Sequence, residues 1–292
     1  MKFTFLSATL LASLALGIPS CGKKGGGSRV EIRVKGSDTM IQLTTAWAEG
    51  YRKVKPNVYI NANGGGSGTG IAAMQNGTTD ICASSRDMTA EEKHKVKETT
   101  GKEAQEFAVC HDALAIYTHK ANPTTEISIE ELKEIWAEGG SINRWEQINP
   151  SFPGEMRMFG RQNNSGTYDY FREHICGRGP DGKPRELKHG ISEMNGSAEV
   201  VENVSKTPNA IGYSGMGYKT KDVNWLKVAP KKGAPGIEPG AEAARTRSYP
   251  IARKLYFYIA GDPNSEMKAF IDWVIGPEGQ KIVVNEGFVA LK

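Results

Sequence analysis

The triplet Ser-Gly-Thr occurs twice in this chain, and each copy stands where an apolar, strand-like run gives way to a helix-like run. One copy lies in the glycine-rich string 64–71 and the other is residues 165–167. A strand, a turn of small residues and a helix form the repeating unit of α/β proteins, and this unit directs the free N–H groups of the helix start toward a ligand. The two copies therefore predict two half-sites, one from each lobe of a bilobal protein, that close on one small anion.

Residues 160–167 have the chemistry of an anion-binding turn. Arg161 comes first, a polar turn follows, and Ser165, Gly166 and Thr167 open a helix-like run. Arginine donates two parallel hydrogen bonds to one oxyanion, and hydroxyl groups add directional hydrogen bonds without adding charge. A helix start also favours a negative ligand. We predict that these four residues bind the anion.

Two turns in the N-terminal part of the chain have a similar organisation. Residues 29–35 alternate apolar and charged side chains, which predicts a strand with one buried face, and Ser37 and Asp38 follow it. Both are also ordinary helix-capping residues, which accounts for one of them but not for the recurrence of the pattern. Ser85 follows a second strand-like run, 80–83, and ligands collect at such strand ends in open α/β sheets.

Arg86 follows Ser85 directly, so it too stands at the expected strand end. Its guanidinium either contacts the ligand or pairs with the carboxylate of Asp87 or Asp38. Arginine suits both roles, and the sequence leaves both open.

Composition and motifs exclude several classes of protein. The formal net charge is +4, or +3 when Lys2 is removed with the N-terminal segment, and no basic run is interleaved with aromatic residues, so we expect no nucleic acid partner. Gly66 and Gly68 begin a dinucleotide-type pattern, but Gly70 is one residue out of register, and no P-loop lysine follows. Neither Cys-x-x-Cys nor His-Glu-x-x-His occurs, and we expect no metal and no cofactor.

The N-terminus has the pattern of a secretory signal. A basic residue and the apolar run 3–16 precede small residues and Cys21. The cysteine resembles that of a bacterial lipobox, which predicts a signal peptide (1–20), lipid attachment at Cys21 and a flexible tether (21–28). A plain signal peptide with a chance cysteine is the alternative, because Pro19 is unusual in a lipobox. The apolar run is too short for an ordinary membrane-spanning helix.

Lipidation would leave three cysteines in the exported protein. An odd number allows at most one internal disulfide, and an exported compartment permits one. Cys82 and Cys110 both lie in apolar, strand-like runs of the first lobe and are the favoured pair. Buried free thiols are an equal alternative for these residues and for Cys176.

Apolar periodicity predicts the remaining elements. Further strands are expected at 58–62, 107–110, 113–117, 156–159, 210–213 and 255–259. Helices are expected around 43–51, at 71–76, after capping boxes at Thr89/Glu92 and Ser128/Glu131, at 170–175, at 199–204 and at 270–275. Exposed loops rich in Gly and Pro are expected at 177–190 and 228–240.

This order of elements predicts two α/β lobes with two crossing segments. The apolar residues around His111-Asp112 lead from the first lobe to the second, and the strand after Tyr249 returns. Lobe 1 is predicted to contain residues 29–112 plus 249–292, and lobe 2 residues 113–248.

The same strings resemble the phosphate-binding proteins of ABC importers, in order from about residue 29 to the end. The matching strings are Gly36–Met40, 66–71, 80–86, 127–145, 161–167, 210–213, Tyr249-Pro250, Gly279-Gln280 and Gly287-Phe288. The resemblance implies a type II periplasmic-binding-protein fold with phosphate in the cleft between the lobes. It implies a monomeric solute-binding protein, periplasmic or at the cell surface, whose partners are the separate membrane subunits of an importer, and no catalytic residues.

Carried over position by position, the resemblance assigns Thr39 and its neighbours to the first half-site, Ser67 to the glycine loop and Arg161 to the second lobe. The predicted phosphate ligands are Ser37, Thr39, Ser67, Ser85, Arg161, Ser165, Gly166 and Thr167, and the further candidates are Asp38, Met40, Gly68 and Arg86.

Ser85 departs from the family pattern. Many members carry an aspartate at this position, which accepts the proton of a protonated phosphate and repels fully ionised sulfate. Here the proton acceptor is Asp38, a backbone carbonyl or no group at all. Shorter members of the family resemble this Ser-Ser-Arg version.

Three other functions compete with phosphate capture. The first is the binding of another tetrahedral oxyanion, which is the same class of function as phosphate capture. A serine hydrolase would use Ser67 or Ser165, but a serine nucleophile needs a positioned base, and only His174 lies near either triplet in the sequence. An adhesion or signalling lipoprotein without ligand binding would not require the arginine and hydroxyl set.

Overall fold

The computed structural model describes residues 29–179 and 182–292, and the predicted signal peptide, Cys21 and tether lie outside the described residues. The strands are β1 (Val30–Gly36), β2 (Val58–Asn63), β3 (Ile81–Ser84), β4 (Ala104–His119), β5 (Glu126–Ser128), β6 (Arg157–Arg161), β7 (Ser192–Met194), β8 (Ala210–Gly215), β9 (Val223–Ala229) and β10 (Ala252–Ala260). The α-helices are α1 (Ile41–Val54), α2 (Ser67–Gln75), α3 (Ala90–Thr100), α4 (Ile129–Trp136), α5 (Gly166–Phe171), α6 (Ser197–Lys206), α7 (Ala241–Arg245), α8 (Ser265–Ile275) and α9 (Pro277–Asn285). Short helical turns cover Asp38–Met40, Trp145–Gln147, Arg172–Cys176 and Met216–Tyr218.

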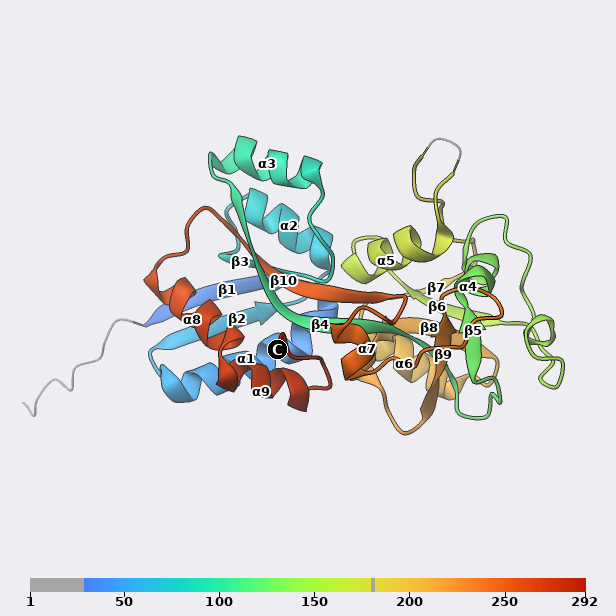
Figure 1. The fold of residues 1–292 in the computed structure, drawn as a ribbon. Coiled ribbons are helices and arrows are strands. Elements are labelled where there is room, and N and C mark those ends of the chain that lie inside the picture. Colours follow the sequence, from blue (N-terminus) through green and yellow to red (C-terminus); the bar gives the residue numbers. More distant parts are fainter. Residues whose placement is uncertain (1–28, 180–181) are drawn as a thin grey trace, which may run out of the picture.

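Two α/β lobes lie side by side, and β4 and β10 run between them (Figure 1). The strand order is β2-β1-β3-β10-β4-β8-β6-β7, with β9 pairing to β4 and β5. Lobe 1 contains the parallel strands β1, β2 and β3, and lobe 2 contains the parallel strands β6, β7 and β8. The α/β fold class with two lobes is therefore confirmed.

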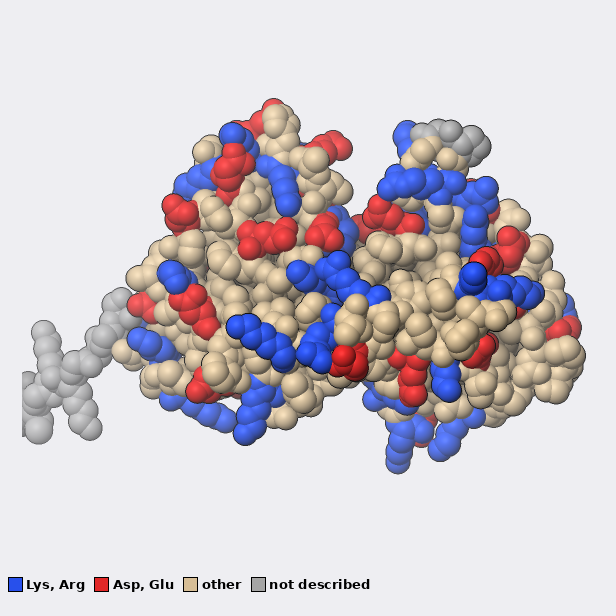
Figure 2. Space-filling model, viewed as in Figure 1, with Lys and Arg blue, Asp and Glu red and all other residues tan. Residues whose placement is uncertain are grey.

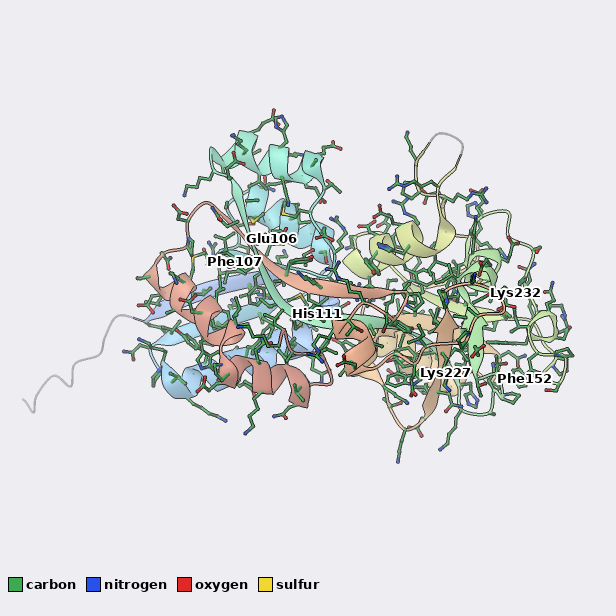
Figure 3. The ribbon with its side chains drawn as sticks, in the orientation of Figure 1. Glu106, Phe107, His111, Phe152, Lys227 and Lys232 are labelled. Atoms are coloured by element: carbon green, nitrogen blue, oxygen red, sulfur yellow. The ribbon has the colours of Figure 1, made fainter. Side chains whose placement is uncertain are left out.

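The crossing strand β4 is one continuous strand, where the sequence predicted two. Its first part pairs antiparallel with β10, from Ala104 opposite Ala260 to Ala113 opposite Ala252. Its second part, from Leu114, pairs with β8 and β9 in lobe 2. Figure 3 shows Glu106, Phe107 and His111 following the strand toward lobe 2. The polar pair His111-Asp112 does not interrupt the strand, because both side chains are buried against neighbouring strands.

Helix ends follow the capping chemistry in the sequence. Both predicted capping boxes form, with Thr89 and Ser128 each accepting a hydrogen bond from the backbone N–H three residues later. Helix α2 begins at Ser67, earlier than predicted, because Gly66 has a φ of 92° that a non-glycine residue rarely adopts. The second half of the glycine string, from Ser67, thus becomes the first turn of α2.

Aromatic contacts fix the helices on the sheet. In lobe 1 the Trp47 ring of α1 meets Phe257 of β10 edge-to-face, with ring centroids 5.6 Å apart. In lobe 2 Tyr213 of β8 stacks on Phe171 of α5 at 3.8 Å and contacts Trp136 of α4 at 5.1 Å. These contacts hold the start of α5 in place, and with it the predicted anion-binding turn.

Of the two alternatives for the cysteines, buried free thiols are confirmed, and the favoured disulfide between Cys82 and Cys110 is not formed. Cys82, Cys110 and Cys176 are buried free thiols. Strand β10 lies between β3 and β4 and separates the two favoured residues, since Cys82 is paired with Tyr258 and Cys110 with Leu255. Burial raises the pKa of all three thiols, that of Cys176 to about 12.

Several short elements were not predicted. Strands β5, β7 and β9 and helix α7 lie in segments whose sequence shows little periodicity. Among the described residues, no helix combines the length and apolar character needed to cross a bilayer.

Candidate anion-binding site

The second-lobe turn is formed by the end of β6 and the start of α5. Arg161 is the last residue of β6, and its backbone N–H donates to the Tyr213 hydroxyl at 3.2 Å. The chain then turns, with the Ser165 N–H donating to the Gln162 carbonyl oxygen at 2.9 Å. Ser165 caps α5, and its Oγ accepts the Thr167 N–H at 3.2 Å.

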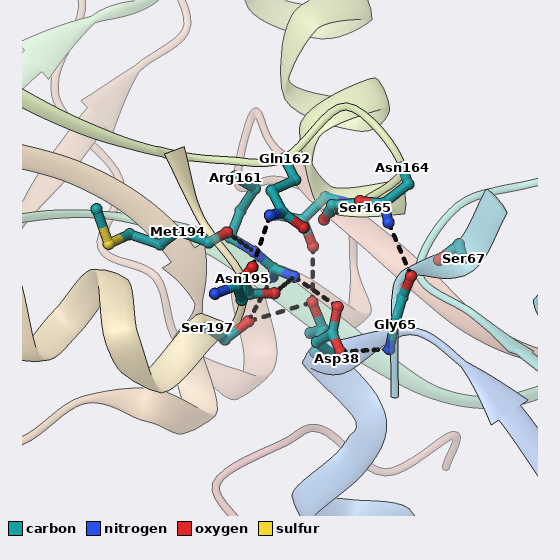
Figure 4. Close-up of polar contacts among 12 residues, drawn as sticks. Asp38, Gly65, Ser67, Arg161, Gln162, Asn164, Ser165, Met194, Asn195 and Ser197 are labelled. Carbon is teal, nitrogen blue, oxygen red and sulfur yellow. Dashed lines mark hydrogen bonds and ion pairs between the residues drawn. The ribbon is translucent and has the colours of Figure 1, made fainter. Parts of the chain in front are cut away.

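Arg161 is a buried cation with 1% of its surface exposed. Its Nη1 donates to Ser197 Oγ at 3.0 Å, and its Nη2 donates to Asp38 Oδ2 and to the Asn195 carbonyl oxygen, both at 2.9 Å (Figure 4). Its Nε donates to the Met194 carbonyl oxygen at 3.3 Å. Burial lowers the pKa of Arg161, and the Asp38 carboxylate opposes that effect. A second negative group beside Arg161 would therefore stabilise the charged guanidinium.

Asp38 belongs to lobe 1, so its ion pair with Arg161 joins the lobes. Its Oδ1 accepts the Gly65 N–H at 2.7 Å (Figure 4). The Tyr218 hydroxyl lies 3.0 Å from the carbonyl oxygens of both Asp38 and Thr39 and fixes this turn. The side chain of Asp38 keeps 17% of its surface exposed.

A cluster of buried hydroxyl groups lies between the lobes. Thr39 Oγ1 is 2.6 Å from Thr167 Oγ1 and 3.4 Å from Ser197 Oγ. Ser85 Oγ is 3.5 Å from Thr167 Oγ1 and 3.3 Å from Ser67 Oγ. Each of these residues is at most 1% exposed. Hydroxyls can donate or accept, so this cluster can reorient toward an oxyanion without a change of charge.

The two Ser-Gly-Thr turns meet directly. The Gly68 N–H donates to the Asn164 carbonyl oxygen at 3.1 Å, and Asn164 Nδ2 donates to the Gly65 carbonyl oxygen at 3.0 Å (Figure 4). Gly166 packs against Ser67, where a Cβ would collide with the Ser67 hydroxyl. The structure thus brings the two predicted half-sites into contact.

The sequence matches a family model described as a PBP superfamily domain over residues 22–278. A relative in Pseudomonas aeruginosa, the phosphate-binding protein PstS, is 32% identical, covering 98% of this chain and 90% of its own length. PstS of Staphylococcus saprophyticus is 30% identical over 98% of this chain and 89% of its own length.

This chain belongs to the PstS family of phosphate-binding proteins within the PBP superfamily.

Solved structures agree with this placement of the chain. A structure from Clostridium perfringens, assigned to the substrate-binding proteins of phosphate ABC transporters and holding phosphate, superposes with a TM-score of 0.77 at 28% identity. The superposition covers 90% of this chain and 100% of the Clostridium perfringens chain. PstS of Borrelia burgdorferi superposes with a TM-score of 0.58 at 25% identity over 90% of this chain and 99% of its own.

Three predicted residues of this PstS-family chain lie at the edge of the cluster. The Ser37 N–H donates to the Ala83 carbonyl oxygen at 2.9 Å, and its side chain makes no capping hydrogen bond. The Met40 N–H donates to the Ser37 carbonyl oxygen at 3.0 Å, and its side chain is fully buried. Gly68 contributes its N–H to the contact with Asn164.

Arg86 points away from the hydroxyl cluster. Its guanidinium makes a two-point pair with Glu92, at 2.8 and 2.7 Å, and its Nε donates to Asp169 Oδ2 at 2.8 Å. Of the two roles left open for Arg86, the structure shows pairing with carboxylates, but the partners are Glu92 and Asp169 and not Asp87 or Asp38. In Asp87 it is the backbone carbonyl oxygen, not the carboxylate, that accepts a hydrogen bond from Arg86, at 2.9 Å, and Asp38 pairs with Arg161.

Sequence reasoning missed Ser197 and Asn164. Ser197 opens α6 after Gly196, so it shows the same Gly-Ser signal at a helix start as Ser67 and Ser37. Asn164 directly precedes the second triplet, where its amide and carbonyl both face lobe 1. The recurrence of the Gly-Ser signal, applied to residues 196–197, would have identified the first of them.

A buried ion pair lies next to the hydroxyl cluster and contacts the backbone of Ser85. Arg253 of β10 pairs with Asp112 of β4 at 2.8 Å, and both side chains are at most 2% exposed. Arg253 Nη1 also donates to the Ser85 carbonyl oxygen at 3.0 Å. Burial raises the pKa of Asp112, and Arg253 opposes that shift. The pair holds the backbone of Ser85 at the junction of the two crossing strands.

Proposed function

We propose that this protein captures inorganic phosphate outside the cytoplasm and delivers it to an ABC-type importer, with the two lobes closing around the anion. The observation that carries the proposal is the buried Arg161 beside hydroxyl groups from both lobes. Its PstS relatives and the phosphate-bound structure from Clostridium perfringens support phosphate as the anion.

The charges near the cluster suit phosphate. Arg161 and Arg253 are balanced by Asp38 and Asp112, so the ligand is recognised mainly by neutral hydrogen-bonding groups. A dianion gains from a buried guanidinium that burial otherwise disfavours, and from hydroxyls at the start of α5.

The proposed ligand set retains most residues predicted from the sequence, adds one and leaves out four. The proposed ligands are Thr39, Ser67, Ser85, Arg161, Ser165, Gly166 and Thr167, and Ser197 joins them. We place Ser37, Met40 and Gly68 in the surrounding backbone, and Arg86 outside the ligand set.

Asp38 is the proposed acceptor for the phosphate proton. Its carboxylate lies beside Arg161, whereas Ser85 supplies only a hydroxyl at the position where the family resemblance implies an aspartate. A carboxylate at this place would accept the proton of monohydrogen phosphate and repel sulfate, which has no proton to donate.

The remaining proposals concern location and organisation. Signal cleavage and lipid attachment at Cys21 would anchor the protein to the membrane through the tether 21–28. We propose that the protein is a monomer in the periplasm or at the cell surface. There it would contact the importer's membrane subunits. We propose lobe boundaries at 112/113 and 248/249, the positions expected from the sequence. We propose binding without catalysis, because Ser165 Oγ caps α5 and Ser67 Oγ accepts the Ser85 N–H at 3.1 Å.

Calorimetric titration with orthophosphate tests the function. We expect one phosphate per protein, and loss of affinity on the order of 100-fold or more in Arg161→Ala, because the buried ligand loses its cationic partner. Arg33→Ala removes another arginine paired with an aspartate, at 2.8 Å on the surface of lobe 1, and should bind normally. No heat with phosphate would contradict the function. Competition with arsenate and sulfate would reveal a preference for another oxyanion.

A further inference from the structure

Arg86 lies at the rim between the lobes, one residue beyond Ser85 of the hydroxyl cluster. It contacts Glu92 of its own lobe and Asp169 of lobe 2. The exposed fractions of these side chains are 13% for Arg86, 22% for Glu92 and 27% for Asp169. In Figure 2 side chains of both charge signs meet in the groove between α3 of lobe 1 and α5 of lobe 2.

Glu92 orients the Arg86 guanidinium within lobe 1. It accepts both terminal nitrogens of the guanidinium, and its Oε2 also accepts the Thr89 N–H at 2.9 Å in the capping box of α3. The fold of lobe 1 alone therefore fixes the direction of Arg86. The pKa of Glu92 is lowered, and the Arg86 guanidinium is the main group that opposes the effect of burial.

Asp169 supplies the contact from lobe 2. It lies in the first turn of α5, the helix whose start carries Ser165 and Thr167. Its Oδ1 is also 4.0 Å from Arg172 in its own lobe. Movement of α5 toward the anion therefore carries Asp169 toward Arg86.

We propose that Arg86 and Asp169 form an interlobe ion pair that holds the closed state and slows release of the anion. The inference rests on the proposed function for its ligand. The pair holds the lobes together around the enclosed anion, so its loss should speed dissociation more than it changes association. A partly buried, two-point arginine network loses less to solvent screening than an exposed pair.

Stopped-flow kinetics with orthophosphate tests this proposal. We expect Arg86→Gln and Asp169→Asn each to raise the dissociation rate roughly tenfold, with a double variant less than additive, because both remove one interaction. Arg86→Lys should dissociate at a rate between those of the wild type and Arg86→Gln, since lysine keeps the charge but not the planar guanidinium. Arg33→Gln, whose guanidinium pairs with Asp80 inside lobe 1, is the matched control and should not change the rate.

Amide exchange gives a readout that does not need phosphate. The Gly68 N–H at the start of α2 is protected by its bond to Asn164 across the cleft. Its exchange should be faster in Arg86→Gln than in the wild type and in Arg33→Gln, with or without phosphate.

The outcomes separate this proposal from the proposed function. If the wild type binds phosphate and the Arg86 and Asp169 variants dissociate at its rate, the ion-pair proposal is overturned and the function stands. If the wild type does not bind phosphate, the function fails, and the exchange of Gly68 decides the ion pair. Equal exchange in wild type and Arg86→Gln would then overturn it.

Discussion

Thr39 Oγ1 and Thr167 Oγ1 lie 2.6 Å apart, although 128 positions separate them and they belong to different lobes. Both residues are fully buried. Two hydroxyls in contact satisfy each other in the closed protein, and either can rotate toward an oxyanion placed between the lobes. The contact therefore marks the plane on which the two half-sites meet.

Thr167→Val should weaken phosphate binding about tenfold or more, and without phosphate its effect on stability should be small because Thr39 keeps the Ser197 hydroxyl as a partner at 3.4 Å. The substitution keeps the shape of the side chain but removes a hydrogen bond to a charged ligand, a contribution of about 1.5–3 kcal/mol. Calorimetry measures the affinity. Thr45→Val, which removes an exposed hydroxyl bonded to the Ile41 carbonyl oxygen, is the control. Equal affinity in Thr167→Val and wild type would place the ligand elsewhere.

Asp38→Asn should reduce the preference for phosphate over sulfate by roughly tenfold. The amide keeps an oxygen that can accept the Gly65 N–H, but it loses the charge that repels sulfate, and a repulsive charge of this kind accounts for much of the discrimination between ligands. Competition calorimetry at a pH where phosphate is mostly monohydrogen phosphate measures the ratio. Asp80→Asn is a close control, because Asp80 also accepts a backbone N–H and an arginine in lobe 1. An unchanged ratio would show that Asp38 does not recognise the phosphate proton.

Gly166→Ala should impair closure more than folding. The added Cβ would collide with Ser67 Oγ and lie 2.9 Å from Ser85 Oγ, and both atoms belong to the other lobe. Overpacking of this kind costs about 1–3 kcal/mol, so we expect phosphate affinity to fall by about 5- to 150-fold. The thermal midpoint without phosphate should change little, as it should in Gly240→Ala, where the nearest atom is 3.9 Å from the new Cβ. A normal affinity in Gly166→Ala would show that the lobes do not approach this closely around the ligand.

Local sequence signals predicted most of the elements around the site. The strand, small-residue turn and helix units fixed the positions of Ser67, Ser85 and Arg161, because each unit is determined by neighbouring residues. The capping boxes at Thr89 and Ser128 formed for the same reason.

Features that depend on distant segments were not predictable. Cys82 and Cys110 are separated by β10, which comes from the far end of the chain. Strand β9 has only a short, irregular apolar pattern and depends on pairing with β4 and β5. The pairing of Arg86 with Asp169 depends on how α5 approaches lobe 1, which nothing near Arg86 in the sequence specifies.

His111 should make the folded protein less stable as the pH falls below the ordinary titration range of histidine. It lies on β4 opposite Lys254, is 8% exposed, and its Nδ1 has no hydrogen-bond partner among the described residues. Burial lowers the pKa of His111, and Lys254, Arg247 and Arg245 lower it further.

The sign of this effect follows from the two states. The unfolded chain takes up a proton near the ordinary pKa of about 6.5, whereas the folded protein takes it up only at a lower pH. Stability is therefore complete above that value and is lost as the pH falls toward the folded pKa. Urea unfolding of the wild type and of His111→Gln between pH 8 and pH 5 measures the difference, and the variant should lose less stability over this range. His94→Gln, at an exposed site beside Glu98, should follow the wild type. Parallel pH profiles for the wild type and His111→Gln would show that His111 is not held in its neutral form by the fold.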